Sequence, residues 1–222
     1  MSHRDFKQRL YPQFARIGRA LASDKRLEIL DLLAQAPRHV EALAAETEMS
    51  VANVSQHLQT LRTANLVESD RKGNLIVYRL ADPSVVDLWL ALRGVAGTRL
   101  AEVEQLAREF LPGRGNGNTV PRDDVPGLLR HNALLLDVRP RTEFEAGHLH
   151  GAINIPIEEL SRRIDEIPGD RRIVAYCRGE YCLFADEAAE LLRSLGFDVV
   201  RMEGGWPEWQ SEGRPVQTGG RK

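Results

Sequence analysis

Two cysteines are the side chains of this 222-residue chain best suited to covalent chemistry. Cys177 and Cys182 are the only two cysteines, and they lie five positions apart. The chain starts MSHRDFKQRLYPQF, which lacks the apolar run of a signal peptide, so we expect a cytoplasmic protein. In that setting the pair is more typical of reactive or metal-binding thiols than of a structural disulfide.

The segments around Cys177 predict the elements that position it. Residues 172–177, RIVAYC, form a short apolar run typical of a buried strand, and residues 183–196, LFADEAAELLRSLG, are typical of an amphipathic helix that ends before Gly196. A cysteine between the carboxyl end of a strand and a helix N-terminus lies where amides and the helix dipole favour an anion. We therefore expect a stabilised, nucleophilic thiolate at Cys177.

The loop after that strand is expected to surround the sulfur with backbone N–H groups, which would hold a thiolate or an anionic persulfide. Arg178 adds a nearby cation, and Glu180 opposes it. The loop comprises Cys177, Arg178, Gly179, Glu180, Tyr181 and Cys182. ALLLDV at 133–138 and FDVVRMEGG at 197–205 predict two more strands, so the expected fold of this half is α/β with a parallel sheet.

Three segments of this half resemble a rhodanese domain. They are LLDVRPRTEFEAGHLHGAINIP, VAYCRGEYC and GFDVVRMEGGWPEW, and the resemblance covers about residues 119–215. It implies that Cys177 accepts sulfane sulfur as Cys–S–SH and passes it to a nucleophile. Further positions that match the family motif are Asp137, Arg139, Glu143, Phe144, Gly147 and His148. We interpret Asp137 and Arg139 as a charge pair that supports the loop, with a direct catalytic role as the alternative, and His148 as structural.

The length of the loop separates two chemistries. Phosphatase relatives of this fold place an arginine after Cys and five further residues, to hold phosphate. Leu183 occupies that position here, which argues against a phosphatase. Rhodaneses with the shorter loop often carry a basic residue where this chain has Cys182, so the sequence argues against efficient turnover of a doubly charged donor such as thiosulfate.

Cys182 has two interpretations. It can attack a persulfide on Cys177, which would release sulfide and leave a disulfide or a short polysulfide bridge. Alternatively, it is a small apolar residue buried at the start of a helix. A zinc site with His148 and His150 is possible by ligand type, but the spacing matches no common zinc module, and we predict neither a metal nor a cofactor.

The N-terminal half predicts helices, a hairpin and a long helix. A first helix is marked by Phe14, Ile17 and Leu21, and RLEILDLLA marks a second. VEALAAET and SVANVSQHLQTLRTA, separated by Glu48-Met49, form a helix-turn-helix, and LVESDRKGNLIVYRL predicts two strands around the turn 70–74. From Asp82 to Phe110, apolar side chains recur every three or four residues. This spacing predicts one helix, with Asp82 as its N-cap and Pro83 at its first position.

The second helix of the helix-turn-helix presents a face suited to the DNA major groove. Ser50 is its expected N-cap, and Val51, Val54, Leu58 and Leu61 are expected on the core side. The opposite side is small, carries amides and lacks acids. The candidate DNA-binding residues are Ser50, Ala52, Asn53, Ser55, Gln56, His57, Gln59 and Thr60 on this helix, with Arg71 and Lys72 at the hairpin. Taken singly, such a helix pair or basic hairpin is also common without DNA binding.

The ordered segments ALASDKRLEILDLLA, VEALAAET and MSVANVSQHLQTLRTANLVESDRKGNLIVYRLADP resemble the ArsR-type winged helix-turn-helix repressors over about residues 10–110. The resemblance implies a homodimer formed by the first and last helices, which binds an imperfect palindrome in double-stranded DNA. The family's usual metal ligands are missing, because residues 38–43 lack cysteine and residues 82–110 lack histidine. His39 and His57 are interpreted as packing or capping residues.

Composition and linker signals divide the chain into two domains. Apolar residues make up 42% and charged residues 28% of the chain, as in globular proteins, and no apolar stretch is long enough to predict a membrane span. Thirty basic against 32 acidic residues exclude a general attraction to nucleic acid, so DNA affinity requires a local surface. The glycine-rich segment LPGRGNGNT predicts a winged helix-turn-helix domain at 1–111, a linker at 112–118 and a rhodanese-like domain at 119–222.

Together these features predict a transcriptional regulator, a repressor, controlled by reactive sulfur species. Cys177 would be the sensing nucleophile, and the sulfane-sulfur donor a polysulfide, a persulfide or thiosulfate. One alternative is a working sulfurtransferase in which the winged helix serves dimerisation or an unrelated signal. Another is an inert rhodanese module that only docks a partner. Multiple turnover with thiosulfate would indicate the first alternative, and an unreactive Cys177 the second.

Overall fold

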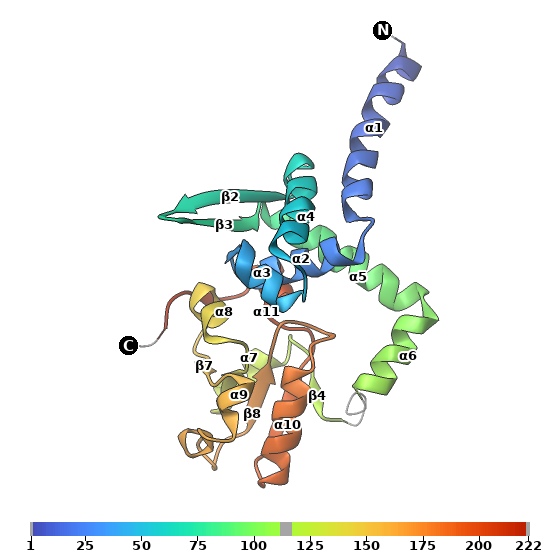
Figure 1. Cartoon of the computed structure of the whole chain (residues 1–222). Coiled ribbons are helices and arrows are strands. Elements are labelled where there is room, and N and C mark those ends of the chain that lie inside the picture. The colour runs from blue at the N-terminus through green and yellow to red at the C-terminus, as the bar shows by residue number, and fades with distance from the viewer. Residues whose placement is uncertain (1, 112–116, 221–222) are drawn as a thin grey trace. The chain divides into compact units, whose positions relative to one another are not determined.

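The computed structural model describes residues 2–111 and 117–220 (Figure 1). The chain forms two compact units that divide between Trp89 and Leu90, and each is considered by itself. Helix α5 (Pro83–Arg99) begins in the first unit and ends in the second. Of the predicted linker 112–118, residues 112–116 lie outside the described ranges, and the predicted domain boundary there stays a prediction.

The first unit is a winged helix-turn-helix. Its three-stranded antiparallel sheet has the order β1-β3-β2, and the hairpin of β2 and β3 projects beside α4 (Figure 1). The elements before α5 are α1 (His3–Leu21), α2 (Asp24–Gln35), β1 (Arg38–His39), α3 (Val40–Glu46), α4 (Val51–Thr63), β2 (Val67–Lys72) and β3 (Leu75–Leu80). Strand β1, which the sequence analysis did not predict, pairs with β3.

The predicted helix-turn-helix is confirmed, including its cap. Ser50 Oγ accepts a hydrogen bond of 3.2 Å from the backbone N–H of Asn53, which satisfies one of the free amides at the start of α4. Val54, Leu58 and Leu61 are fully buried in the core of the unit, as predicted. Val51 is not part of that core, because its side chain is 45% exposed. The first turn of α4 therefore extends beyond the packed surface.

The hairpin is tighter than predicted. Strand β2 continues through Lys72 and β3 begins at Leu75, which leaves Gly73 and Asn74 as a two-residue turn instead of the predicted 70–74. Gly73 has φ +62°, a conformation that costs glycine nothing and that short hairpins require. Arg71 therefore lies in the strand and pairs with Ile76, not in the turn.

The predicted helix from Asp82 to Phe110 is two helices. Its start is confirmed, since Pro83 is the first helical residue and the Asp82 side chain accepts a 2.9 Å hydrogen bond from Ser84 N–H. At Leu100 the backbone is extended (φ −107°, ψ 109°), and α6 (Ala101–Phe110) follows. Two glycines and a threonine in the last turns of α5 weaken the helix there, whereas the apolar spacing continues through the break.

The second unit contains a five-stranded, wholly parallel sheet with the order β4-β9-β8-β5-β7. Besides the C-terminal part of α5 and α6, its elements are β4 (Thr119–Val120), α7 (Val125–Arg130), β5 (Leu134–Asp137), α8 (Arg141–Ala146), β6 (His148–Leu149), β7 (Ile153–Asn154), α9 (Ile157–Leu160), a 3-10 turn (Ile164–Glu166), β8 (Ile173–Tyr176), α10 (Phe184–Ser194), β9 (Val199–Met202), α11 (Trp206–Ser211) and β10 (Val216–Gln217). The predicted parallel α/β fold is confirmed.

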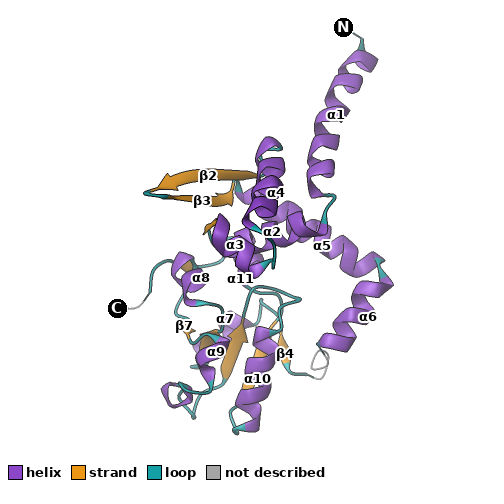
Figure 2. Ribbon diagram, viewed as in Figure 1, coloured by secondary structure: helices purple, strands orange, loops and turns teal. Residues whose placement is uncertain are grey.

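The central strands β5, β8 and β9 are buried along their whole length, as is typical of parallel strands covered on both faces. Figure 2 shows α9 and α10 beside these strands. Leu134, Leu136 and Ala175 pack with the residues of α9 and α10, and Cys177 belongs to the same cluster. On the other face, alternate residues such as Leu135 pack with α7, α8 and α11. Cys177, which follows β8, is therefore buried on the face of the sheet that α10 covers.

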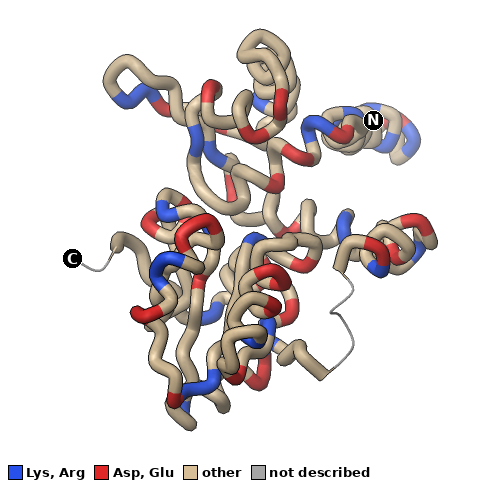
Figure 3. Tube along the Cα trace, turned by 60° about the horizontal axis from the view of Figure 1, so that its bottom comes forward, with Lys and Arg blue, Asp and Glu red and all other residues tan. Residues whose placement is uncertain are grey.

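Charged residues of both signs occur along both units. Lys and Arg are interspersed with Asp and Glu along the trace in Figure 3, in keeping with the net charge of −2. Attraction to nucleic acid must therefore come from a local surface.

Within residues 2–111 and 117–220, none of the helices combines the length and the apolar character that crossing a bilayer requires.

Candidate functional site

Cys177 follows β8 directly and is completely buried, whereas Cys182 is partly exposed; both thiols are free. In this reduced state the Cys177 sulfur faces two carbonyl oxygens, at 3.9 Å for Gly179 and 3.7 Å for Cys182. The thiol of Cys177 also donates a hydrogen bond to the Cys182 sulfur. The loop therefore holds Cys177 as an S–H donor.

The expected thiolate at Cys177 is not what the reduced loop favours. Burial raises the pKa of Cys177 well above its usual range, and the hydrogen bond that it donates to Cys182 raises it further. The same hydrogen bond lowers the pKa of Cys182, and the backbone N–H groups of Phe184 and Arg178 lower it too. The predicted amide support thus lies mainly at Cys182, because that sulfur sits at the start of α10.

Arg178 is bound to a buried carboxylate. Its Nε and Nη2 atoms lie 2.9 and 2.5 Å from Glu143 Oε1, and the Glu143 side chain is fully buried. Its guanidinium also lies 5.5 Å from the centre of the Phe184 ring. The predicted cation is therefore present, and its charge contributes to the lowered pKa of Cys182. These hydrogen bonds to Glu143 join the loop to α8.

Arg201 is a residue of the loop environment that the sequence analysis missed. It lies on β9, is 4% exposed, and donates from Nη2 to the carbonyl oxygens of Gly179 (3.2 Å) and Glu180 (2.9 Å). Its Nε atom lies 3.2 Å from a carboxylate oxygen of Asp186 on α10. The signal that was available is an arginine inside the apolar run FDVVRM, because a charge in a buried strand requires partners.

Asp137 and Arg139 form the predicted charge pair. Both side chains are fully buried, with 2.7 Å between Arg139 Nη2 and Asp137 Oδ2. Burial lowers the pKa of Arg139, but the Asp137 charge and hydrogen bonds outweigh burial and raise it overall. Arg139 also donates to Gly147 O, and its guanidinium lies 5.1 Å from the centre of the Trp206 ring. The backbone N–H of Trp206 in turn donates to Cys177 O at 3.0 Å. Support of the loop is thus indirect, and a catalytic role for the pair stays a prediction.

Two histidines have structural surroundings. His148 is buried, stacks on Phe144 at 3.7 Å, and its Nδ1 lies 2.8 Å from Phe144 O. His39 caps α3 by accepting from Ala42 N–H at 3.2 Å. In the part of the chain that the structure describes, no three His, Cys, Asp or Glu side chains gather as a group able to hold a metal ion.

The candidate DNA-binding face of α4 is directed to solvent. The exposed residues are Ser50, Ala52, Asn53, Ser55, Gln56, Gln59 and Thr60, and His57 is half-buried. The hydroxyls of Ser55 and Thr60 donate to the carbonyl oxygens of Val51 (2.8 Å) and Gln56 (3.1 Å), so they are tied to their own helix. The amide side chains of Asn53, Gln56 and Gln59 are exposed on the same face.

At the wing, Arg71 and Lys72 are both exposed at the end of β2. Arg71 Nε donates to Gly73 O at 3.2 Å, which steadies its side chain beside the turn. Both cations are thus in strand positions at the tip of a narrow hairpin, a placement suited to phosphate contacts.

Comparisons with known proteins match both units. A model of the family described as "Bacterial regulatory protein, arsR family" matches residues 23–69, and one described as "Rhodanese-like domain" matches residues 123–212. The HTH-type transcriptional regulator Rv0324 of Mycobacterium tuberculosis is 44% identical over 221 residues, which cover 97% of this chain and 95% of the relative.

Other relatives match one unit each. A protein of Allochromatium vinosum named "Sulfurtransferase" is 31% identical over 38% of this chain and 78% of its own length. The solution structure of the homodimeric winged helix-turn-helix DNA-binding domain (fragment 1–100) of Mb0332 from Mycobacterium bovis is 44% identical, covers 45% of this chain and 91% of that chain, and has a TM-score of 0.42. The near full-length identity to a transcriptional regulator, together with the two family matches, shows that this chain belongs to the ArsR family of bacterial transcriptional regulators and carries a rhodanese-like domain at its C-terminal end.

Proposed function

We propose that this regulator represses transcription as a homodimer and that reactive sulfur species control its DNA binding through Cys177. The observation that carries the proposal is the pair of free thiols in one loop after β8, with the Cys177 sulfur fully buried and 3.7 Å from Cys182 O. The pKa of Cys182 is lowered, and its sulfur accepts the hydrogen bond from the Cys177 thiol. Transfer of that proton along the existing hydrogen bond leaves Cys177 as a thiolate when a donor arrives.

The first chemical step is transfer of one sulfane sulfur. The Cys177 thiolate attacks the outer sulfur of a donor R–S–SH, the donor's S–S bond breaks, and RS⁻ leaves. The transferred sulfur keeps its proton, and Cys177 becomes Cys–S–SH. A hydropolysulfide or an alkyl persulfide supplies this sulfur without a further oxidant.

The second step involves Cys182. The departing RS⁻ takes the proton that Cys182 received, which leaves Cys182 as a thiolate. This thiolate attacks the Cys177 sulfur of the persulfide, the S–S bond between Cys177 and the outer sulfur breaks, and HS⁻ leaves, so that a Cys177–Cys182 disulfide remains. The bridge converts a transient sulfur transfer into a lasting change of loop shape. In the disulfide, Cys177 no longer has an S–H group, so it cannot donate to the carbonyl oxygens of Gly179 and Cys182.

The DNA-binding part of the proposal rests on α4 and on exposed apolar helices. The amides of Asn53, Gln56 and Gln59 would read bases of each half-site, and Arg71 and Lys72 would contact backbone phosphates.

Aromatic residues on α1 (Phe6, Tyr11 and Phe14) and apolar residues on α6 (Leu106 and Phe110) are all at least half exposed. Burial of these faces between two copies would form the dimer and place one α4 at each half of a palindrome.

The test is a fluorescence-anisotropy titration of the protein's own upstream DNA, before and after polysulfide treatment, at one salt concentration. We expect treatment to weaken binding 5- to 150-fold, which corresponds to a coupling of about 1–3 kcal/mol, and dithiothreitol to restore it. The Cys177→Ser variant should bind DNA like the untreated protein and fail to respond. A Cys177→Ser variant that still releases DNA on treatment would overturn the proposal.

A sulfurtransferase is the second candidate function. It is favoured by the resemblance of this unit to a relative named "Sulfurtransferase" and by the buried cysteine after the central strand. Multiple turnover with thiosulfate and an acceptor, unaffected by Cys182→Ser, would support an enzyme whose winged helix serves another purpose. If Cys177 reacts with no sulfane donor, the unit is a docking module.

A further inference from the structure

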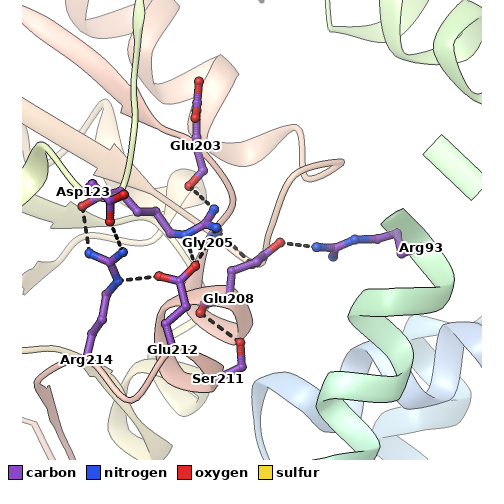
Figure 4. Close-up of polar contacts among 9 residues, drawn as sticks. Arg93, Asp123, Glu203, Gly205, Glu208, Ser211, Glu212 and Arg214 are labelled. Carbon is purple, nitrogen blue, oxygen red and sulfur yellow. Dashed lines mark hydrogen bonds and ion pairs between the residues drawn. The ribbon is translucent and has the colours of Figure 1, made fainter. Parts of the chain in front are cut away.

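Helix α5 reaches the cysteine loop within the second unit. Arg93 of α5 forms an ion pair with Glu208 of α11 (Figure 4), and the two side chains are only 13% and 10% exposed. The pair lies against Gly179: a Cβ atom there would be 3.0 Å from Arg93 Nη1 and 3.3 Å from Glu208 Oε1. Arg93 and Glu208 therefore occupy the space that a side chain in the loop would fill.

Glu208 also holds the turn that closes on Cys177. Its Oε2 accepts a 2.9 Å hydrogen bond from Gly205 N–H (Figure 4). Gly205 packs so closely that a Cβ atom would be 2.2 Å from Cys177 O and 2.4 Å from Gly179 N. A displacement of Cys177 or Gly179 must therefore move this turn, and with it the carboxylate that Arg93 binds.

A second contact between α5 and the loop involves Tyr181. The Arg93 guanidinium lies 6.0 Å from the centre of the Tyr181 ring. Tyr181 Oη fits against Gly97, where a Cβ atom would be only 2.6 Å away. Helix α5 thus contacts the loop through Arg93 and Gly97, which are one helical turn apart. The loop residues that they contact are Gly179 and Tyr181.

Sulfuration of Cys177 adds an atom inside the protein. Cys177 is fully buried, and protein interiors are close-packed, so we expect an added sulfur atom to move the loop or the Gly205 turn. The other end of α5 is fixed in the first unit, where Val85 is buried and Trp89 Nε1 donates to Asp31 Oδ1 at 2.8 Å. Helix α5 is therefore anchored in the first unit by Val85 and Trp89, and farther along it lies against the Cys177 loop and is bonded to Glu208 of α11.

Building on the proposed function, we propose that Arg93 is a positioning residue for the Cys177 loop, and that the Arg93–Glu208 pair transmits the sulfur state of Cys177 to α5. In the reduced protein the pair holds Gly179, Tyr181 and the Gly205 turn in register with the helix. Sulfuration displaces the loop and separates the pair, which frees the second half of α5. The DNA-binding unit then receives the signal along its own last helix.

The test compares Arg93→Gln, Glu208→Gln and the double variant with the unchanged protein, and uses Arg99→Gln as the control. Arg99 is on the same helix and is exposed. Two quantities are measured: the ratio of operator Kd after and before polysulfide treatment, and the fraction of Cys177 that mass spectrometry finds as a persulfide or as a disulfide with Cys182. We expect the ratio of 5–150 to fall below about 3 in either single variant, while Cys177 still reacts to the same extent.

The double variant should lose no more of the response than the singles, because both remove the same interaction. Arg99→Gln should keep the unchanged ratio. An Arg93→Gln protein that retains the full ratio would overturn the inference and leave sulfur sensing intact.

Hydrogen exchange separates this inference from the proposed function. If the unchanged protein shows no polysulfide response on DNA, the proposed function fails, and the role of Arg93 is judged by amide exchange in residues 90–99. We expect exchange there to become faster on sulfuration in the unchanged protein, to stay constant in Cys177→Ser, and to be fast without treatment in Arg93→Gln. Exchange in residues 90–99 that polysulfide treatment does not change, in a protein whose Cys177 has reacted, contradicts the inference.

Discussion

The α4 face and the Cys177 loop are built in opposite ways. Helix α4 is capped by its own Ser50, packs through Val54 and Leu58, and turns its polar side chains to solvent. The loop is held by residues far along the chain: Arg178 binds Glu143, 35 positions away, and Arg93 binds Glu208, 115 positions away. A surface that reads another molecule must stay exposed, whereas a site that protects a reactive sulfur must be enclosed. Local sequence therefore specifies the first, and distant contacts complete the second.

The largest effect should come from the buried pair of the second unit. Asp137→Ala leaves the Arg139 charge buried without its carboxylate, so we expect the free energy of unfolding of this unit to fall by about 3–5 kcal/mol. Urea unfolding can be followed by the fluorescence of Trp206 and Trp209 in a Trp89→Phe background. DNA affinity of the folded protein should change little if the two regions are independent in stability.

The matched control for that variant is Arg141→Ala. Its side chain is 75% exposed in an ion pair with Glu145, and we expect a change within about 0.5 kcal/mol. If Asp137→Ala and Arg141→Ala lower the free energy of unfolding equally, burial does not decide how much each ion pair contributes to stability.

A smaller effect is expected at the exposed face. Gln56→Ala removes an amide directed to solvent, and we expect it to reduce discrimination between the operator and a scrambled sequence by about 1–3 kcal/mol, as loss of a base contact does. Arg71→Ala should instead weaken binding to both DNAs equally and reduce the salt slope by about one. Anisotropy at several salt concentrations measures both. If Gln56→Ala weakens both DNAs equally, Gln56 reads no base.

The cap of α4 should contribute less. Ser50→Ala removes the acceptor of Asn53 N–H, and we expect it to cost about 1 kcal/mol of stability in the first unit, measured by urea unfolding. Ser55→Ala is the control, because the Ser55 hydroxyl bonds back to Val51 O, a contact that adds little to helix stability. A loss at Ser55 equal to that at Ser50 would show that the cap is not what stabilises the helix start.

The smallest effect concerns the two thiols. The hydrogen bond from Cys177 is the largest cause of the lowered pKa of Cys182, so Cys177→Ala should raise that pKa toward its usual range. Alkylation of Cys182 by iodoacetamide requires the thiolate and rises with pH. The midpoint of its pH profile should therefore lie below that of an ordinary cysteine in the unchanged protein and move to higher pH in the variant. An unchanged midpoint would mean that the helix amides alone set the acidity.

Much of the fold could be predicted because its signals are local. The spacing that places Val54, Leu58 and Leu61 on one side of α4, the cap at Ser50 and the runs ending at Asp137 and Cys177 each depend on neighbours in the chain, and these are confirmed. The errors arose where the local signal was continuous across a change in structure. Apolar spacing continues through Leu100, where the helix breaks, and Val51 has the spacing of a core residue but lies beyond the packed surface.

By itself the sequence determined the helix-turn-helix and hairpin of the first unit, the position of Cys177 after a buried strand and the polar face of α4. These follow from hydrogen bonding and side-chain periodicity over a few residues. Only the tertiary structure decided which thiol is the more acidic, where Arg178 is directed, and that Arg201 and Arg93 surround the loop. The physical reason is that pKa values and ion pairs depend on burial and on the distance between charges, and folding sets both between residues far apart in the chain.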